Sequence, residues 1–577
     1  MIKIENLTFT YPGADKPNLR QICLEINKGD FLAIIGNNGC GKSTLCKTLN
    51  GLIPHFISGD IEGKVLVAGM DTKEQDVGKL ACKVGYVYQD FENQIVRPTV
   101  LDDASFACLN YAMPDYEARG REALRMCGLE SKANEYIWQL SGGQKHLLAL
   151  AGAVALSPDI LILDEPIAQL DPAHARQIYD VLKELNEKYG KTIIVIEHHT
   201  EFIADYCKSV VLMKDGEIIW KKEAADALRQ VKELKESNIF PPQITMAAKE
   251  LIAQGVLDEA VVLPTTIEEG REVFGELTFY EDVPLSSTLE SNKVEEVGKR
   301  ECTVSFDKVG MAYRAVKGSN HKVMKDFNLK IHKGEKIALI GSNGAGKSTL
   351  MKLMIGLLKP TEGQVLIHGK DTRACTAEEL SREISLVYQN PEEMFIKDSI
   401  RADIEYAMKV RRVEGYEEKT QALLKRFHLE EIANRDGRLL SGGQMRRASL
   451  AIGIALNPSI LLLDEPTANL DIATRREIMK TLNDMKDITE TVMIATHDMQ
   501  LVCDWAERII VLSAGCLMDD GERNQIFKNP IVTELVGIRP PEIYMMGQAL
   551  DLRAQCYTVE AFGSKFRRET LDVSQVI

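Results

Sequence analysis

The sequence predicts an α/β protein made of two tandem domains, each with a mainly parallel sheet and helices on its faces. Two observations predict this fold class. Four short motifs occur twice in the same order at offsets of 299 to 305 residues, which indicates a duplicated domain of roughly 280 residues. Within each copy, apolar β-branched runs such as Phe31–Ile35 alternate with helical patterns.

The duplication rests on motif pairs whose spacing is nearly constant. The pairs are Gly36–Thr44 with Gly341–Thr349, Leu140–Gln144 with Leu440–Gln444, Ile160–Pro166 with Ile460–Pro466, and Pro241–Ile244 with Pro540–Ile543. Between the copies, residues 256–300 carry eleven Asp or Glu against four Lys or Arg, and Pro284–Thr288 is typical of a flexible crossing. We therefore expect a first domain at 1–280, an acidic linker at 281–301 and a second domain at 302–577.

Length and composition fit a globular chain of several domains. A chain of 577 residues is too long to form a single hydrophobic core. Of its residues, 45% are hydrophobic and 27% are charged. The formal net charge is −15, and such an acidic balance argues against broad contact with nucleic acid, which needs clustered Lys and Arg. The twelve cysteines form no Cys-x-x-Cys pair, so we expect reduced thiols and no zinc or iron–sulfur cluster.

No segment has the length of a membrane span. The best apolar run, Leu147–Leu156, is half of the about 20 residues that a span needs. Met1–Asn6 alternates like a strand and lacks the apolar core of a signal peptide. These patterns predict a protein of the cytoplasm, which a partner could hold against a membrane.

The repeated glycine-rich segment predicts a nucleotide-binding loop, because a strand precedes it and a helix follows it. Its glycines let backbone N–H groups turn inward around phosphates at the positive end of the helix. Lys42 and Lys347 would reach the β- and γ-phosphates of a nucleotide, and Ser43 and Ser348 would bind Mg²⁺. A chance glycine turn is the alternative, but two copies in the same context favour the loop. The loop residues are Gly36, Asn37, Asn38, Gly39, Cys40, Gly41, Lys42, Ser43 and Thr44, and Gly341, Ser342, Asn343, Gly344, Ala345, Gly346, Lys347, Ser348 and Thr349.

An apolar strand that ends in Asp-Glu supplies the expected chemistry. Asp164 and Asp464 would hold the Mg²⁺ shell, and Glu165 and Glu465 would polarise the attacking water. One such pair could be solvated carboxylates at a strand end. Two pairs at the same distance from a glycine loop favour the catalytic interpretation.

The motif Leu-Ser-Gly-Gly-Gln precedes each Asp-Glu pair by about 20 residues and identifies the family that the chain resembles. A serine and two glycines at a helix start offer backbone donors and a positive dipole end to an anion. With this motif the chain resembles ATP-binding-cassette proteins over nearly its whole length. The resemblance implies two P-loop NTPase cassettes, each with a helical signature subdomain and a C-terminal extension. The signature residues that would contact ATP are Ser141, Gly142, Gly143 and Gln144, and Ser441, Gly442, Gly443 and Gln444.

The resemblance implies roles for further residues. Gln89 and Gln389 match the Q-loop glutamine, which senses Mg²⁺ and water. His198 and His497 match the switch histidine, although a lone histidine is usually structural and His199 adds a second candidate.

Other positions match contacts with the adenine ring and with the partner cassette. Tyr11 and Tyr313 stand where the family stacks a ring on adenine, with strand packing as the alternative. Asp171 and Asp471 match the D-loop, which crosses to the partner cassette.

The two copies differ near these motifs. After the signature, Met445-Arg446-Arg447 stands in the second copy where Lys145-His146-Leu147 stands in the first. In the first copy, Ile167 stands at the position that Thr467 has in the second copy. No catalytic group is lost, so we expect two competent sites, with equal turnover in some doubt.

Two classes of function remain open. One is the ATPase of a membrane transporter, and the other is a soluble tandem cassette that acts on ribosomes or DNA. The translation-associated group joins its cassettes by a basic helical linker and the DNA-repair type carries zinc cysteines, whereas this linker is acidic and no cysteine pair is present. These differences favour the transporter.

More specifically, the chain resembles the fused ATPases of energy-coupling factor (ECF) importers. The resemblance lies in Asn50–Pro54, in Gln89–Gln94 with its counterpart Gln389–Met394, and in the Pro-Pro segments near the end of each copy. Met394 departs from the glutamine that is usual there. The implied partners are an integral membrane subunit and a membrane substrate-binding subunit. The implied location is the cytoplasmic face of the cell membrane, and the implied cargo is a vitamin, a vitamin precursor or a transition-metal ion.

The resemblance also implies where the membrane subunit docks. In cassette proteins the surface after the Q-loop glutamine forms a groove for helices of that subunit. Here this surface is Gln89–Val96 and Gln389–Ile396, in which Phe91 and Phe395 are expected to be exposed. The alternative is that these stretches only cap the helical subdomain.

Overall fold

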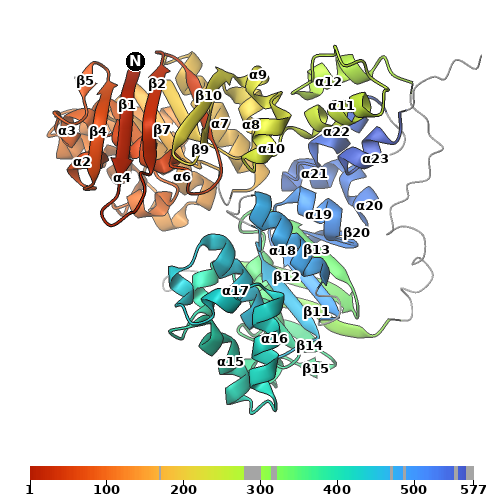
Figure 1. The fold of residues 1–577 in the computed structure, drawn as a ribbon. Helices are drawn as coiled ribbons and strands as arrows, with labels where there is room; N and C mark the ends of the chain where they lie inside the picture. The colour runs from red at the N-terminus through yellow and green to blue at the C-terminus, as the bar shows by residue number, and fades with distance from the viewer. Residues whose placement is uncertain are drawn as a thin grey trace, which may run out of the picture. The chain divides into compact units, whose positions relative to one another are not determined.

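The protein is described from a computed structural model of the whole chain. The structure describes residues 1–167, 170–278, 300–313, 321–467, 472–484, 489–551 and 556–566. The chain forms two compact units: Met1–Glu281 with Met545–Ile577, and Asp282–Tyr544. Figure 1 shows that each unit combines sheets with covering helices, which confirms the predicted α/β class.

The first unit contains two sheets. The outer sheet has the order β2-β1-β4-β5 and is antiparallel. The inner sheet has the order β10-β9-β3-β8-β7-β6 and is parallel except for the β9–β10 pair. The strands are β1 (Ile2–Thr10), β2 (Leu19–Ile26), β3 (Phe31–Ile35), β4 (Asp60–Val67), β5 (Met70–Asp71), β6 (Val84–Val87), β7 (Ile160–Asp164), β8 (Thr192–Ile196), β9 (Ser209–Lys214) and β10 (Glu217–Glu223).

Burial explains why the central strands read as continuous apolar runs. Every residue of β3, β7 and β8 is buried, as expected for parallel strands that are covered on both faces. The residues of β1 alternate between buried and more exposed positions, as expected for a sheet with one face on the core. The segments that follow β3, β7 and β8 therefore leave the sheet from a fully buried part.

The helices of the first unit fall into three groups. Those around the sheets are α1 (Lys42–Leu49), α2 (Leu52–His55), α3 (Val77–Ala81), α7 (Pro172–Glu187), α8 (Thr200–Tyr206), α9 (Ala224–Leu228) and α10 (Val231–Glu236). The helical subdomain contains the short helix η1 (Phe91–Gln94), α4 (Val100–Asn110), α5 (Tyr116–Met126) and α6 (Gly142–Val154). The extension contains α11 (Gln243–Ala253) and α12 (Ile267–Phe274).

The second unit repeats this plan. Its sheets have the orders β12-β11-β14-β15 and β16-β17-β18-β13-β19-β20. The strands are β11 (Cys302–Tyr313), β12 (His321–His332), β13 (Lys336–Gly341), β14 (Glu362–Ile367), β15 (Lys370–Asp371), β16 (Ile384–Val387), β17 (Ile460–Asp464), β18 (Thr491–Ala495), β19 (Arg508–Ser513) and β20 (Cys516–Gly521). The helices are α13 (Lys347–Met354), α14 (Ala377–Leu380), η5 (Pro391–Met394), α15 (Ile400–Val410), α16 (Tyr416–Arg426), α17 (Gly442–Ile454), α18 (Ile472–Asp484), α19 (Met499–Trp505), α20 (Arg523–Lys528) and α21 (Pro530–Val536). The chain passes from the second unit back to the first within α22 (Glu542–Ala549).

The end of the chain packs in the first unit. The helix α23 (Val559–Gly563) lies beside α11, as Figure 1 also shows. The rings of Phe274 and Phe562 are 5.3 Å apart and both are almost fully buried. The repeat places these residues in the second domain, at 302–577, whereas the described residues 545–551 and 556–566 group with the first unit. The predicted linker lies mostly outside the described residues and stays a prediction.

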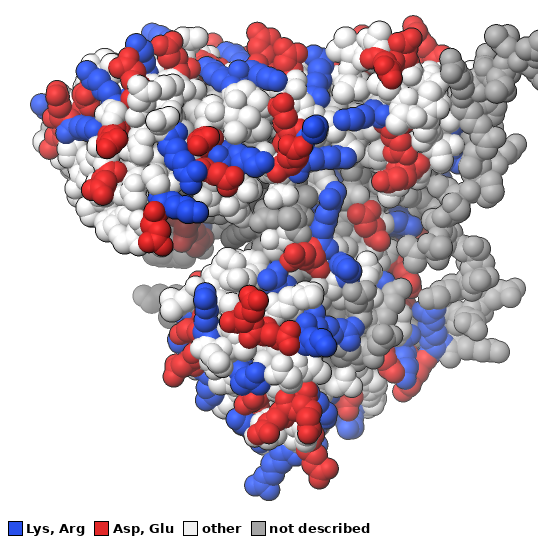
Figure 2. Space-filling model, viewed as in Figure 1, with Lys and Arg blue, Asp and Glu red and all other residues white. Residues whose placement is uncertain are grey.

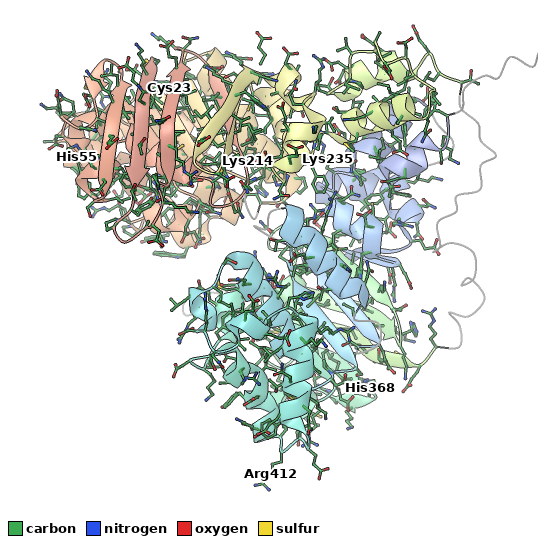
Figure 3. The ribbon with its side chains drawn as sticks, in the orientation of Figure 1. Cys23, His55, Lys214, Lys235, His368 and Arg412 are labelled. Carbon is green, nitrogen blue, oxygen red and sulfur yellow. The ribbon has the colours of Figure 1, made fainter. Side chains whose placement is uncertain are left out.

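The twelve cysteines all lie in the described residues, and none of them forms a disulfide. Cys23, which Figure 3 labels on the outer sheet, exchanges hydrogen bonds with Asn6.

Among the described residues, no helix is both long enough and apolar enough to span a membrane.

Candidate functional site

The first P-loop joins β3 to α1 and is shaped by glycines. Gly41 has φ 105°, a conformation that favours glycine, and it immediately precedes α1. A Cβ atom at Gly36 would lie 2.3 Å from the carbonyl oxygen of Met213, so only glycine fits there. Lys42 is buried, and its Nζ donates hydrogen bonds to the carbonyl oxygens of Gly36 at 2.8 Å and Asn37 at 3.0 Å. The ammonium group thus lies over the loop that would cradle phosphates.

The second P-loop repeats this geometry between β13 and α13. Lys347 Nζ donates to the carbonyl oxygens of Gly341 at 2.5 Å and Ser342 at 3.4 Å. It also lies 3.0 Å from Nε2 of His497, which in turn lies 3.1 Å from Oδ1 of Asn343. The predicted switch histidine therefore contacts the predicted P-loop lysine inside one cassette.

The carboxylate that ends the inner strand lies next to the P-loop serine in each cassette. Ser348 Oγ donates to Asp464 Oδ2 at 3.1 Å. Burial raises the pKa of Asp464 above its usual value, and the hydrogen bond from Ser348 lowers it in part. Burial likewise raises the pKa of Asp164, against hydrogen bonds from Ser43 and Tyr86. A serine hydroxyl beside a carboxylate is a hard oxygen set that fits Mg²⁺.

The predicted catalytic residues of the first cassette lie together around Glu165. Gln89 Nε2 donates to Glu165 Oε2 at 2.7 Å, and His198 Nε2 lies 3.2 Å from Glu165 Oε1. Glu165 itself has φ 51°, a left-handed conformation that costs a non-glycine residue free energy. The hydrogen bond from its backbone N–H to the carbonyl oxygen of Ile196, at 3.1 Å, holds it there.

The second cassette holds Glu465 differently. Glu465 shares the left-handed backbone, with φ 46°. The backbone N–H of His497 donates to its Oε2 at 3.3 Å. Its Oε1 is buried and lies 3.5 Å from Nε2 of His497, but it has no hydrogen-bond partner among the described residues. Gln389, which the sequence places at this site, is exposed, as Gln89 is in the first cassette. A buried carboxylate oxygen without a donor has capacity to accept a proton from water.

The two glutamates differ in the direction of their pKa shifts. Burial alone would raise the pKa of Glu165, but the hydrogen bond and charge of His198 and the charge of Lys42 lower it below its usual value. Burial raises the pKa of Glu465, and the charge of Lys347 does not offset this.

These shifts predict opposite effects of pH on two matched variants. The raised pKa of Glu465 means that the folded state loses stability as pH rises from the unfolded-state pKa through the folded one. The lowered pKa of Glu165 means that the ionised form stabilises the fold at neutral and higher pH. Without nucleotide and Mg²⁺, Glu465→Gln should raise the unfolding temperature more at pH 8.5 than at pH 5.5, and Glu165→Gln should lower it at pH 8.5. Shifts of the same sign at pH 8.5 would contradict the two environments described above.

The signature motifs begin α6 and α17 as capping boxes. Ser141 Oγ accepts a hydrogen bond from Gln144 N at 3.3 Å, and Gln144 Oε1 accepts one from Ser141 N at 3.0 Å. In the second copy, Ser441 N donates to Gln444 Oε1 at 3.2 Å. The first glycine of each motif is open on its outer side, which leaves room for an anion to approach the helix start.

The remaining predicted residues lie at the edges of these sites. Tyr11 and Tyr313 each place their hydroxyl 3.2 Å from a P-loop threonine, so both rings are held next to the nucleotide loop. Asp171 caps α7, and its carboxylate bonds His174 within its own cassette. Asp471 lies outside the described residues.

Sequence patterns missed a buried support for the first switch histidine. Glu197 accepts hydrogen bonds from the backbone N–H of His198 at 2.7 Å and from the hydroxyl of Tyr179 at 2.7 Å. The second cassette supports the same turn with Asp498, which accepts from Thr467 at 3.2 Å. In the first copy, His199 stands at the position of Asp498, so no carboxylate is present there to accept a hydrogen bond. The residue at the position of Thr467 therefore needs no hydroxyl, which explains Ile167. The signal was present as a paired difference between the two copies.

The expected exposure of the two phenylalanines is corrected. Phe395 is only 6% exposed, and its ring lies against the backbone of Gly437. Phe91 is half-buried and stacks on His146. The exposed apolar residues of these stretches are instead Val96 and Ile396, at 57% and 66%. Aromatic rings fill the gap below each loop because the helical subdomain needs a core of its own.

The fold and the site define a protein with two P-loop ATP-binding cassettes, each with an Asp-Glu pair, a histidine and a signature helix. The family model described as ABC transporter matches residues 19–168 and 324–468. The chain belongs to the ABC transporter family, and it is an ATPase whose ATP hydrolysis serves transport.

Relatives match over almost the full length. A Methanosarcina mazei protein described as a candidate ABC transporter ATP-binding protein is 32% identical over 565 residues, which cover 97% of this chain and 95% of that protein. A protein of Caldanaerobacter subterraneus with the same description is 32% identical over 95% of this chain and 96% of its own. The solved structure of CbiO1 from Clostridium perfringens, part of the transporter complex CbiONQ, is 32% identical and covers 41% of this chain and 94% of its own, with a TM-score of 0.37.

Proposed function

We propose that this chain is the ATP-hydrolysing motor of an importer of the ECF type, which takes up a vitamin, a vitamin precursor or a transition-metal ion. The observation that carries the ATPase part is the gathering of a lysine, an Asp-Glu pair and a histidine in each cassette. The ECF part is supported by the sequence segments that resemble that group and by the helical extension that follows the first cassette.

The site residues divide the chemistry among them. Lys42 and Lys347 would hold the phosphates of ATP, and the signature of one cassette would close over the ATP of the other, within one chain or between two. Glu165 and Glu465 would take the proton of the attacking water.

Mg²⁺ would neutralise phosphate charge when it is bound, and the chain offers oxygen and amide ligands for it. Ser43, Asp164 and Gln89 would hold it in the first cassette. Ser348, Asp464 and Gln389 would hold it in the second.

The integral membrane subunit would bind beside the Q-loops, Gln89–Val96 and Gln389–Ile396. Val96 stands two residues before Pro98, whose carbonyl oxygen accepts a hydrogen bond from the backbone N–H of Ile137 at 3.1 Å, and Tyr136 and Trp138 flank Ile137 in the chain. Tyr136 and Trp138 are exposed and stack with ring centroids 4.4 Å apart. An apolar surface of this kind fits a cytoplasmic helix of an integral membrane subunit.

The alternative is a soluble tandem cassette that acts on ribosomes or DNA. Figure 2 shows Lys and Arg interspersed with Asp and Glu on the visible face, rather than gathered into a basic stripe. With a net charge of −15, the chain has little to offer a phosphate backbone at physiological salt. Both observations favour the membrane partner.

Purification from native membranes tests the proposal. The full-length chain, held with ATP and mild detergent, should co-purify with an integral membrane subunit and a small substrate-binding membrane protein, and it should leave ribosomes behind. A control with the Glu217→Gln variant, altered at an exposed position on β10, should recover the same partners. Recovery of ribosomes in an ATP-dependent and salt-sensitive manner, without membrane proteins, would support the alternative instead.

A further inference from the structure

The backbone that leads into each Q-loop is held by different side chains in the two cassettes. The first Q-loop is Gln89–Val96 and the second is Gln389–Ile396. In the first, Gln94 belongs to the loop itself, and its Oε1 accepts a hydrogen bond from Tyr88 N at 2.9 Å. Its Nε2 donates to the carbonyl oxygen of Tyr86 at 3.0 Å. The first Q-loop is therefore clamped to its own strand by its own amide.

The second Q-loop cannot use this clamp, because Met394 stands where Gln94 stands in the first copy. A residue of the signature helix α17 reaches the loop instead. Arg446 Nη1 donates to the carbonyl oxygen of Tyr388 at 3.0 Å, and Nη2 donates to that of Gln389 at 2.8 Å. Arg446 is only 3% exposed, and a rigid guanidinium fork suits two neighbouring carbonyl groups.

Among the described residues of the first cassette, the signature helix α6 reaches the Q-loop through contacts of a different kind. His146 stands at the position of Arg446, is 1% exposed, and neither ring nitrogen has a hydrogen-bond partner in the described parts of the chain. Its ring stacks on Phe91 with centroids 4.2 Å apart. The polar link there is the ion pair of Lys145 with exposed Glu92, at 2.8 Å, and exposed pairs contribute little.

We propose that Arg446 is a positioning residue that fastens the second Q-loop to the signature helix, in place of the internal clamp that Gln94 provides in the first cassette. The first cassette combines Gln94 with His146, and the second combines Met394 with Arg446. Each cassette therefore has one of the two clamps, which is Gln94 in the first and Arg446 in the second. In the second cassette a shift of α17 must carry the backbone of Gln389 with it. In the first cassette the contacts between α6 and the loop are between side chains, namely the stack of Phe91 on His146 and the ion pair of Lys145 with Glu92, and Gln94 rather than α6 holds the backbone that leads into the loop. The functional meaning rests on the proposed role of the Q-loop glutamine.

Hydrogen exchange in the purified full-length chain tests this fastening. Arg446→His, which copies the first cassette, should speed amide exchange in residues 384–395 by about tenfold or more, because two hydrogen bonds from a charged donor are lost. Exchange in residues 84–95 should not change. The matched control is Arg447→His, whose guanidinium bonds Glu477 on α18 at 2.5 Å and which should leave residues 384–395 protected.

Two further measurements separate positioning from general damage to the fold. In Arg446→His, kcat for ATP should fall while KM stays within about twofold, because Arg446 does not contact the P-loop. Adding Met394→Gln to Arg446→His supplies the internal clamp and should restore both protection and kcat. Unchanged exchange in residues 384–395, or equal loss in Arg447→His, or no restoration by Met394→Gln, would overturn the inference. None of these results depends on a membrane partner, so they stand apart from the test of the importer function.

Discussion

Glu165→Gln and Glu465→Gln should each lower ATP turnover on the order of 100-fold, while ATP binding stays near the wild-type level. Both glutamates follow an aspartate at the end of an inner strand, which is buried in the first cassette and half-buried in the second, and both have a left-handed backbone. Glutamine keeps the volume and one acceptor oxygen, but it replaces the second oxygen that accepts a hydrogen bond with an NH2 group and cannot take a proton from water. Phosphate release measures turnover, and the rise in unfolding temperature with ATP measures binding.

Two outcomes would limit this expectation. If one variant leaves ATPase activity untouched, that site is not catalytic and the expectation of two competent sites fails. If both variants lose ATP binding as well, the glutamates hold the nucleotide rather than the water. Glu217→Gln, which changes an exposed carboxylate on β10, is the control for a general effect of the substitution.

A second large effect is expected at the docking surface. The double variant Val96→Asp and Ile396→Asp should reduce the membrane-bound fraction on the order of tenfold, because each introduces a charge that docking would have to bury. Basal ATPase activity should survive, since neither side chain reaches the P-loops or the catalytic glutamates. Sedimentation with native membranes and uptake of labelled cargo measure the loss.

The control for docking makes the same valine-to-aspartate change at an exposed position away from the Q-loops. Val262→Asp alters a valine in the extension that is 64% exposed, comparable to Val96, and should remain membrane-bound. If the folded double variant still associates with membranes and supports uptake, the membrane subunit binds at another surface. Equal loss in Val262→Asp would point to a general effect of added negative charge.

The sequence was sufficient for the fold class, because parallel strands buried on both faces leave long apolar runs and because the domain is present twice. It also named residues that the structure brings together, such as Gln89, Glu165 and His198. A motif states which residue follows which strand, and parallel strands bring their carboxyl ends to one edge. Their catalytic roles stay predictions until the variants are measured.

What the sequence could not predict depends on packing between segments far apart in the chain. Phe395 reads like an exposed loop residue, yet it is buried because Gly437, on a different turn, leaves room for its ring. The clamp from Arg446 could not be foreseen either, because nothing local distinguishes an arginine that faces solvent from one that faces a loop 57 residues earlier. Comparison of the two copies position by position was the available signal.

The aromatic contact between Phe274 and Phe562 also sets the order in which the protein can be completed during synthesis. Roughly 290 residues separate the two rings, and at about 5–20 residues per second the ribosome needs about 15–60 s to make them. During that time the apolar face of α11 and α12 has no covering helix, so the nascent first unit presents a surface that chaperones bind. A ribosome that stalls in the second copy would therefore release a first cassette that still exposes Phe274, and quality-control proteases could recognise the unfinished chain by it.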